Sequence, residues 1–247
     1  MSLGGLTNWR FALTLFCLVT GLAQATHGFA ADFELQGGFS TDVGTATYSF
    51  VQLGVETRFA ETLGFVAQLT TSFLTFKTRE EDKTIWAEAP SATELIGLRY
   101  HFTDTTTISL LAGGQEKETR FFGGHPRFRD DNGFVTKAEF YSQLNPTTEL
   151  TVEYRYSMAE ASHYALVAPK HALVRFGSRE QFSFDVGVEA SVAVSTDFEQ
   201  EQAGLVLGVT HRPTNTSLQF TGGAARFTSG SERGFIPHVG VGFFASF

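Results

Sequence analysis

The chain ends on VGVGFFASF, residues 239–247, and this stretch decides the fold. Its residues alternate between an apolar face and a second face that carries two glycines and a serine. Termini of soluble domains are usually polar and frayed, whereas this one has a strand pattern up to its last residue. The pattern therefore predicts a terminal strand whose apolar face needs an apolar environment. That face consists of Val239, Val241, Phe243, Ala245 and Phe247.

The same period of two recurs along most of the chain, which indicates an all-β protein. In residues 182–192, for example, Phe, Val and Ala alternate with Ser, Asp, Gly and Glu. No segment shows the period of 3.6 that is typical of a helix. The pattern predicts twelve strands, at 32–40, 48–59, 64–77, 91–102, 107–119, 134–144, 149–159, 163–175, 181–195, 201–212, 216–228 and 235–247.

Two of the predicted strands are irregular. Residues 163–175 contain Pro169, which has no N–H to donate to a sheet, so a bulge or a break is expected there. The sequence QEKETR, residues 115–120, blurs the second half of the strand at 107–119. A barrel of ten strands therefore stays an alternative to one of twelve.

The lengths of the strands and of their connections favour a transmembrane antiparallel up-and-down β-barrel. Many strands exceed the usual five or six residues and match the roughly 9–11 residues that cross a bilayer at a tilt. Short turns follow the even-numbered strands, and the two longest connections, 78–90 and 121–133, follow odd-numbered ones. This is the layout of an outer-membrane barrel, with both termini in the periplasm. Phe59, Phe102 and Phe247 end descending strands and predict an aromatic girdle at the inner interface.

A sheet inside lipid must close, because an open edge would leave backbone groups unpaired at several kcal/mol each. We therefore expect the strand at 235–247 to pair with the strand at 32–40. The terminal strand also resembles the signal that bacterial outer-membrane proteins present to the barrel-insertion machinery. That resemblance assigns the role of an insertion signal to Val239, Val241, Phe243 and Phe247.

The alternative is a soluble barrel or sandwich, with apolar side chains inside and polar side chains outside. The polar face would suit the exterior of such a protein, and it would equally suit a wet or ion-paired lumen. Strand length, the layout of the loops, the terminal Phe and 26 Phe among 247 residues favour the membrane barrel. The predicted lumen charges are Glu56, Arg58, Arg99, Lys137, Glu139, Glu153, Arg155, Asp185 and Glu189.

The first residues predict a cleaved export signal. An arginine precedes the apolar run FALTLFCLVTGLAQA, residues 11–25, which ends in the small-x-small cleavage pattern Ala-Gln-Ala. The run is shorter than the roughly 20 apolar residues of a spanning helix, which disfavours a membrane anchor. The predicted organisation is a signal peptide at 1–25, with cleavage as late as residue 31 as an alternative, and a barrel at 32–247. The one cysteine, Cys17, lies in the signal, so no disulfide is expected in the exported chain.

No catalytic, cofactor or metal site is predicted. A lipid hydrolase needs Ser and His within hydrogen-bond reach, but Ser162 and His163 are adjacent, so in a strand they point to opposite faces. The exported chain has no Cys, no His-x-His and no His-Glu-x-x-His, which argues against a zinc site. The net charge of −8 argues against nucleic acid as a partner. A lipid-modifying enzyme is the least favoured hypothesis.

The predicted lumen is the most specific indication of function that the residues supply. Twelve strands lie between the filled interior of eight-stranded barrels and the open channel of porins. Inward charges of both signs can pair across strands, which favours a narrow, mostly occluded bore over a small-solute pore. In the two long loops aromatic rings stand beside charges, which suits contact with sugar rings or packing onto the rim. These aromatic residues are Trp86, Phe121, Phe122 and Phe128.

Residues 133–176 have the sequence GFVTKAEFYSQLNPTTELTVEYRYSMAEASHYALVAPKHALVRF, whose pattern is similar to that of a known family. It contains an acidic and aromatic strand at 138–141, an Asn-Pro turn, a Tyr-rich strand and a brief loop into Tyr164-Ala165. This pattern resembles the BcsS family, small outer-membrane proteins encoded with alphaproteobacterial cellulose synthesis. The resemblance covers the C-terminal half of the chain and contains no catalytic motif, so no residue's role is transferred from the family.

The resemblance implies a non-enzymatic accessory role in cellulose synthesis or export, at the outer membrane of a Gram-negative bacterium. It does not imply that this barrel is the export pore. Such a barrel would contact outer-membrane lipid, lipopolysaccharide and the insertion machinery, and the resemblance adds the cellulose synthesis or export proteins, or the polysaccharide itself. The alternative function is a small-solute pore.

Overall fold

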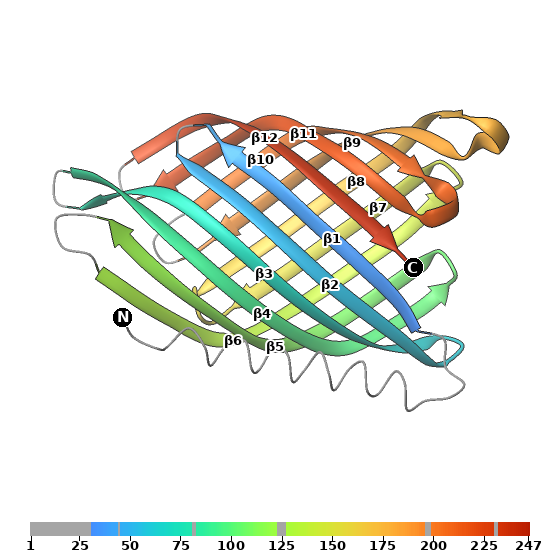
Figure 1. Cartoon of the computed structure of the whole chain (residues 1–247), viewed down its shortest axis with the longest axis horizontal. Helices are drawn as coiled ribbons and strands as arrows, with labels where there is room; N and C mark the ends of the chain where they lie inside the picture. Colours follow the sequence, from blue (N-terminus) through green and yellow to red (C-terminus); the bar gives the residue numbers. More distant parts are fainter. Residues whose placement is uncertain (1–30, 44, 81–82, 123–126, 196–198, 230–231) are drawn as a thin grey trace.

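The strands follow one another around a closed barrel, in which each is antiparallel to its neighbours and crosses the barrel obliquely (Figure 1). The computed structural model describes residues 31–43, 45–80, 83–122, 127–195, 199–229 and 232–247. The predicted signal peptide and Cys17 lie outside these residues. The strands are β1 (Ala31–Asp42), β2 (Ala46–Ala60), β3 (Leu63–Glu80), β4 (Lys83–Thr103), β5 (Thr106–Phe122), β6 (Arg127–Asn145), β7 (Thr148–Ser157), β8 (Ser162–Phe176), β9 (Phe182–Val194), β10 (Glu199–His211), β11 (Thr216–Ser229) and β12 (Glu232–Ser246). Twelve strands in a closed antiparallel barrel confirm the predicted fold.

Among the described residues, the other regular elements are two short 3₁₀ turns, η2 (Ser178–Glu180) and η3 (Arg212–Thr214). In the described part of the chain, no helix is long and apolar enough to cross a membrane.

The last residue of the chain takes part in closing the barrel. The backbone N–H of Phe247 donates to the carbonyl of Phe33 at 2.9 Å, and the N–H of Phe33 donates back to the carbonyl of Phe247 at 3.1 Å. Further along the seam, Phe39 of β1 stands opposite Val241 of β12. Because this pairing joins the first strand to the last, the sheet has no open edge.

The side chains of the barrel are distributed in the opposite way to those of a soluble protein. Large apolar side chains cover the outside: Leu110 is 62% exposed, and Leu205 and Phe220 are similarly exposed. Glu56 is 4% exposed and Asp185 is 3% exposed, because both lie inside the barrel. Hydrocarbon-facing apolar residues around a polar lumen are the pattern of a barrel in lipid, which excludes the soluble alternative.

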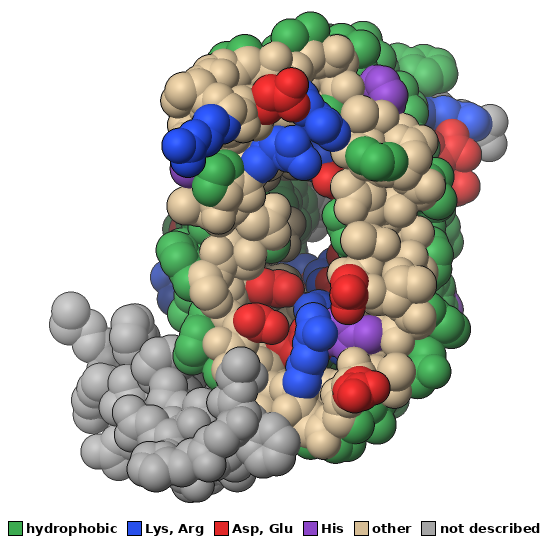
Figure 2. All heavy atoms as spheres, turned by 90° about the vertical axis from the view of Figure 1, so that its right-hand side faces the viewer, with side chains coloured by type: hydrophobic (Ala, Val, Ile, Leu, Met, Phe, Trp, Pro, Cys, Tyr) green, Lys and Arg blue, Asp and Glu red, His purple; other side chains and the backbone are tan. Residues whose placement is uncertain are grey.

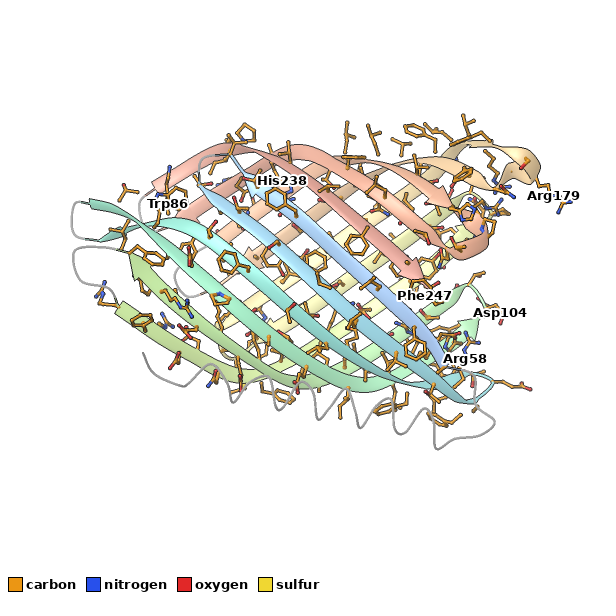
Figure 3. The ribbon with its side chains drawn as sticks, in the orientation of Figure 1. Arg58, Trp86, Asp104, Arg179, His238 and Phe247 are labelled. Atoms are coloured by element: carbon orange, nitrogen blue, oxygen red, sulfur yellow. The ribbon has the colours of Figure 1, made fainter. Side chains whose placement is uncertain are left out.

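Three aromatic residues mark one end of the barrel, which we call the C-terminal end. Phe59, Phe102 and Phe247 lie at the ends of strands that descend to this end, and each is at least 50% exposed. Figure 3 shows Phe247 towards this end of the barrel and Trp86 at the opposite end, which we call the distal end. The exposed rings have the positions of an interfacial aromatic girdle.

The prediction of two long loops, at 78–90 and 121–133, was wrong. The β3–β4 ladder continues to the pair Glu80 and Lys83, and the β5–β6 ladder continues to the pair Phe121 and Arg127. The pattern of alternation explains this extension, because Ile85, Ala87 and Ala89 are all buried on one face of β4. Trp86 and Glu88, which alternate with these residues, are on the other face of the strand and do not lie in a loop.

Two of the three prolines inside the described strands, Pro90 and Pro169, occur where one neighbouring ladder is interrupted. Pro90 of β4 pairs with Phe73 of β3, whereas the β4–β5 register skips from Glu88 to Ser91. Pro169 pairs with Leu150 of β7, and the β8–β9 register skips residues 168 and 169. The missing N–H of proline is thus accommodated without ending the strand, and β8 is continuous, with a register shift between Ala172 and Val174.

An apolar cluster fills part of the lumen beside four adjacent strands. Val66, Leu95, Leu111 and Val135 come from β3, β4, β5 and β6 and are each buried. Side chains packed against this wall reduce the open cross-section there. The remaining polar part of the lumen is where the candidate sites lie.

Candidate functional site

The polar lumen is visible from the C-terminal end in Figure 2, where charged side chains surround and enter the opening and hydrophobic side chains cover the flanks. Buried polar side chains inside the barrel come from most of the strands, among them Gln68, Gln115, Ser142 and His238. Since each strand alternates its faces, one polar residue in two is enough to line the lumen. In the described part of the chain, ion pairs and cavities lie inside this lumen.

The first group of ion pairs joins β1, β2, β4 and β5. Arg99 Nη1 lies 3.0 Å from Glu34 Oε1 and 2.9 Å from Glu56 Oε2, and Arg99 Nε donates to Ser109 Oγ at 2.8 Å. His101 Nε2 contacts the other oxygen of Glu56. Because Arg99 and Glu34 are on β4 and β1, with two strands between them, this group spans the lumen. We call Glu34, Glu56, Arg99 and His101 the Arg99 group.

The second group of ion pairs is centred on Lys137 of β6. Its ammonium lies 2.6 Å from Glu139 Oε1 and 3.4 Å from Glu153 Oε2, and it also donates to Gln68 Oε1 at 3.4 Å. Gln68 in turn donates to Glu139 Oε2 at 3.3 Å. Since Gln68 is on β3, this group also reaches across strands that are not neighbours. These contacts hold the buried ammonium of Lys137 and its oxygen partners in fixed positions in the lumen.

The other predicted lumen charges occupy separate places. Arg155 Cζ lies 5.5 Å from the ring centre of Tyr164, and Glu189 accepts from Gln202 at 3.3 Å. Arg58 is 3.6 Å from Glu56 but its side chain is 43% exposed, so it lies at the mouth of the C-terminal end (Figure 3). Asp185 is on the far side of this end and accepts from Thr210. The nine charges predicted from sequence are therefore divided among several groups.

The larger cavity has a volume of about 490 Å³ and occupies the part of the lumen towards the distal end. Uncharged polar side chains are the largest group in its lining, and aromatic rings stand among them. The glutamines are Gln36, Gln52, Gln200, Gln202 and Gln219; the rings are those of Tyr48, Phe50 and Tyr164. We call this space the glutamine cavity.

Sequence reasoning from charges alone missed the residues of the glutamine cavity. Their signal was present in the alternation, because Gln200 and Gln202 share a face of the segment EQEQ. The sequence does not specify that four strands would bring their glutamines to one space. The sequence likewise does not specify the contacts of Asp42 near the distal end. His238 Nδ1 lies 2.8 Å from Asp42 Oδ1, and Gln200 donates to Asp42 Oδ2 at 2.9 Å.

The third group of ion pairs lies at the distal end, where Glu160 in the turn between β7 and β8 contacts Lys117 of β5. The two side chains are 2.9 Å apart, and Ser162 Oγ donates to Glu160 Oε2 at 3.1 Å. Burial alone would raise the pKa of the Glu160 carboxyl, but the Lys117 ammonium and the Ser162 hydroxyl hold it below its ordinary value. The carboxylate is thus charged at neutral pH and joins two strands that are not neighbours.

The four aromatic residues that were expected in loops lie at the distal ends of strands. Trp86 and Phe122 are register partners on β4 and β5 and are about equally exposed. Phe128 is 68% exposed, and Phe121 stands beside the guanidinium of Arg127, 5.9 Å from the ring centre. Rings at the ends of strands have the positions of a second aromatic girdle.

The pair Ser162 and His163 has no catalytic geometry. The Ser162 hydroxyl is buried and donates to Glu160, whereas His163 is exposed and its Nδ1 lies 2.7 Å from the hydroxyl of Tyr154. The two side chains therefore occupy opposite faces of β8, as the sequence predicts. Within the described ranges, no three His, Cys, Asp or Glu side chains are arranged to hold a metal ion.

No protein-family model and no curated protein matches this chain. Among solved structures, the β domain of the Bordetella autotransporter BrkA is similar, with a TM-score of 0.51 and 10% identity over 89% of this chain and 99% of that one. The translocator domain of the autotransporter NalP from Neisseria meningitidis has a TM-score of 0.45 and 13% identity, over 97% of this chain and 96% of that one. The KdgM porin has a TM-score of 0.42 and 9% identity, over 87% and 99%.

These neighbours are outer-membrane barrels, and at such low identity the similarity is one of fold. They do not link the chain to the BcsS family, so that resemblance stays a prediction. The strand order, the closed seam and the inverted distribution of side chains, together with the similarity to the BrkA β domain, establish the fold: the chain forms a twelve-stranded antiparallel barrel of the outer-membrane kind.

Proposed function

We propose that this chain is an outer-membrane barrel that acts, without catalysing a reaction, as an accessory component of exopolysaccharide synthesis or export. The observation that carries this proposal is the glutamine cavity, a space of about 490 Å³ lined by amides, hydroxyls and aromatic rings. The polymer that the resemblance of residues 133–176 favours is cellulose. The lining of the lumen favours a neutral sugar as the ligand, and the resemblance favours cellulose as the polymer.

The chemistry of the cavity suits a neutral polyhydroxylated ligand. Amide groups both donate and accept hydrogen bonds, as sugar hydroxyls do, and aromatic faces pack against the C–H faces of sugar rings. The side chains of Gln52, Gln200 and Gln202 already bond to neighbours, which holds their amides in place. Of the charges that line the cavity, Lys137 is paired with Glu153, and Asp42 lies beside His238. Arg155 lies over the ring of Tyr164, and Glu189 accepts from Gln202. A neutral ligand therefore meets polar groups that are already held in place.

The orientation that we propose places the C-terminal end in the periplasm and the distal end at the cell surface, because both termini of such barrels lie on the periplasmic side. The outer face would contact membrane lipid and lipopolysaccharide. The proposed protein partners are the barrel-insertion machinery and the synthesis or export proteins of the polymer. The glutamine cavity would then be open to polymer from the surface side.

The test is to delete the gene and to measure surface cellulose, with complementation by the wild type, by Gln200→Ala/Gln202→Ala and by Leu205→Ala. We expect loss of polymer in the deletion and recovery with the wild type and with Leu205→Ala, whose side chain faces outward. The double glutamine variant should recover little polymer although it reaches the membrane. Unchanged polymer in the deletion strain would refute the accessory role.

A second function, a small-solute pore, is favoured by the volume of the same cavity. A pore predicts measurable single-channel conductance in planar bilayers. Glu189, which lines the cavity, would then influence ion selectivity, so Glu189→Lys should shift the reversal potential towards anion preference, whereas the outward Val188→Leu should not. Absence of conductance in the wild type, with the barrel folded, would eliminate the pore.

A further inference from the structure

A second cavity opens at the C-terminal end, on the opposite part of the lumen from the Arg99 group. Its volume is about 200 Å³, and its lining comes from β6 to β10, the turns between them and the turn that contains η3. Three basic side chains line it, from Lys170, Arg175 and Arg212, together with two acidic ones, from Glu149 and Asp185. Figure 2 shows Lys and Arg side chains gathered at one side of the opening at this end.

The two acidic side chains of this cavity already have partners. Glu149 lies 3.2 Å from the ammonium of Lys170 and also hydrogen-bonds the hydroxyl of Tyr141. Asp185 accepts from the hydroxyl of Thr210 at 2.6 Å. Lys170 is neutralised in this way by Glu149. Asp185 keeps its negative charge, but among the described residues neither carboxylate of the cavity forms an ion pair with Arg175 or Arg212.

The two arginines, by contrast, have unused hydrogen-bond donors. Arg175 Nη2 donates to the carbonyl of Pro146 at 2.7 Å, and its Nη1 is 3.9 Å from the exposed carboxylate of Glu180. Arg175 Nε is buried and has no hydrogen-bond partner in the described part of the chain. Arg212 has no carboxylate within ion-pair distance among the described residues. A buried N–H of a charged group without a partner costs free energy, so it indicates a ligand.

We infer that this cavity binds a small oxyanion, a phosphate or a carboxylate group, between Arg175 and Arg212. Guanidinium groups match the planar and tetrahedral oxygens of such anions through paired N–H donors. At about 30 Å³ for each water, a cavity of this volume has room for an oxyanion and several waters. The site opens to the periplasmic side in the proposed orientation. It does not depend on the proposed role in polysaccharide synthesis.

The test is calorimetric titration of the folded barrel in a neutral detergent, at constant ionic strength, with inorganic phosphate and separately with acetate. We expect saturable binding of at least one of these anions. The anion that binds more tightly shows whether the site prefers a phosphate or a carboxylate group. Arg212→Gln should weaken it roughly tenfold or more, because a charge-assisted hydrogen bond is lost. Arg175→Gln should do the same. The matched control is Arg226→Gln, which alters an exposed arginine outside the cavity.

Folding of each variant is checked by its heat-dependent mobility in detergent gels. If the Arg175→Gln barrel does not fold, the affinity of Arg212→Gln alone tests the inference. Three results would overturn the inference. They are the absence of saturable binding with both anions, equal affinity of the wild type and Arg212→Gln, or an equal loss in Arg226→Gln, which would indicate unspecific attraction to positive charge.

Discussion

At the scale of single residues, Arg99 shows how an ion pair inside a barrel differs from one on its surface. Its guanidinium contacts two carboxylates and a hydroxyl at distances of 3.0 Å or less. Removing one partner of a buried pair leaves uncompensated charge, which costs more than the pair itself contributes. The positions of Glu34 and Glu56 therefore depend on Arg99.

We predict that Arg99→Leu lowers the free energy of unfolding by about 3–5 kcal/mol, because the buried Glu56 and the partly exposed Glu34 lose their cation. The measurement is urea unfolding in lipid vesicles, followed by tryptophan fluorescence. The control is Arg226→Leu, whose exposed pair with Glu201 should change stability by less than about 1 kcal/mol. Equal effects of the two substitutions would show that the Arg99 group is hydrated like a surface pair.

A second prediction at this scale concerns the pH dependence of the distal end. The folded pKa of Glu160 lies below its unfolded value, so its contribution is present above the unfolded pKa and is lost as the pH falls through the folded pKa. Glu160→Gln should therefore destabilise the barrel at pH 7, by about 1 kcal/mol or less, and should be neutral well below pH ~4. The measurement is thermal unfolding of both proteins across this range. A difference that persists unchanged at low pH would contradict the assignment.

At the scale of strands, two adjacent glycines of β5 have different surroundings. A Cβ on Gly113 would overlap the carbonyl of Glu94 on β4, whereas a Cβ on Gly114 would meet no atom within 4 Å. Because the overlap is with backbone, it cannot be relieved by a side-chain rotation. The close approach of β4 and β5 at this point therefore requires glycine on one face only.

We predict that Gly113→Ala destabilises the barrel by about 1–3 kcal/mol, because the two strands must separate locally. Its neighbour provides the control, since Gly114→Ala should stay within about 0.5 kcal/mol of the wild type. The midpoint of heat-dependent mobility in detergent gels measures both. If the two variants melted together, the close approach of β4 and β5 would not be a feature of the folded protein.

The elements differ in how far the sequence could predict them. The positions of the short turns were predictable, because local turn residues such as Asn145 and Pro146 specify them. The extended hairpins were not predictable, because charges near residues 78–90 suggested a loop although the alternation of the two strand faces continued. Which lumen charges meet was also outside the reach of sequence. The contact of Arg99 with Glu34 depends on the cross-section of the closed barrel, which no local pattern encodes.

At the scale of the whole molecule, closure depends on the last residue. Two backbone hydrogen bonds join Phe247 to Phe33, and the exposed Phe247 ring stands at the level of the girdle. The terminal strand also carries the proposed insertion signal. Closure and recognition by the insertion machinery would thus use the same few residues.

We predict that deletion of Phe247 reduces the amount of folded barrel in cells several-fold, because both the seam and the proposed signal are shortened. The measurement is the folded fraction in membranes, by heat-dependent mobility. Phe247→Tyr, which keeps the backbone and the ring, should restore most of it. If the deletion protein assembled normally in cells, the insertion signal would have to lie elsewhere.

The seam itself has a mechanical consequence. Nine residue pairs join β1 to β12, and the hydrogen bonds between Phe33 and Phe247 add a tenth, against eighteen pairs between β3 and β4 and ten between β7 and β8. Among the described strands, the seam is also the ladder whose two strands are not consecutive in the chain, so no turn connects them. A force applied along the wall would load every ladder, and we expect the seam to yield first. The seam is therefore the weakest contact around the barrel, and it joins the first strand to the last. A barrel that opens at this seam would become a sheet in which the long hairpins remain paired.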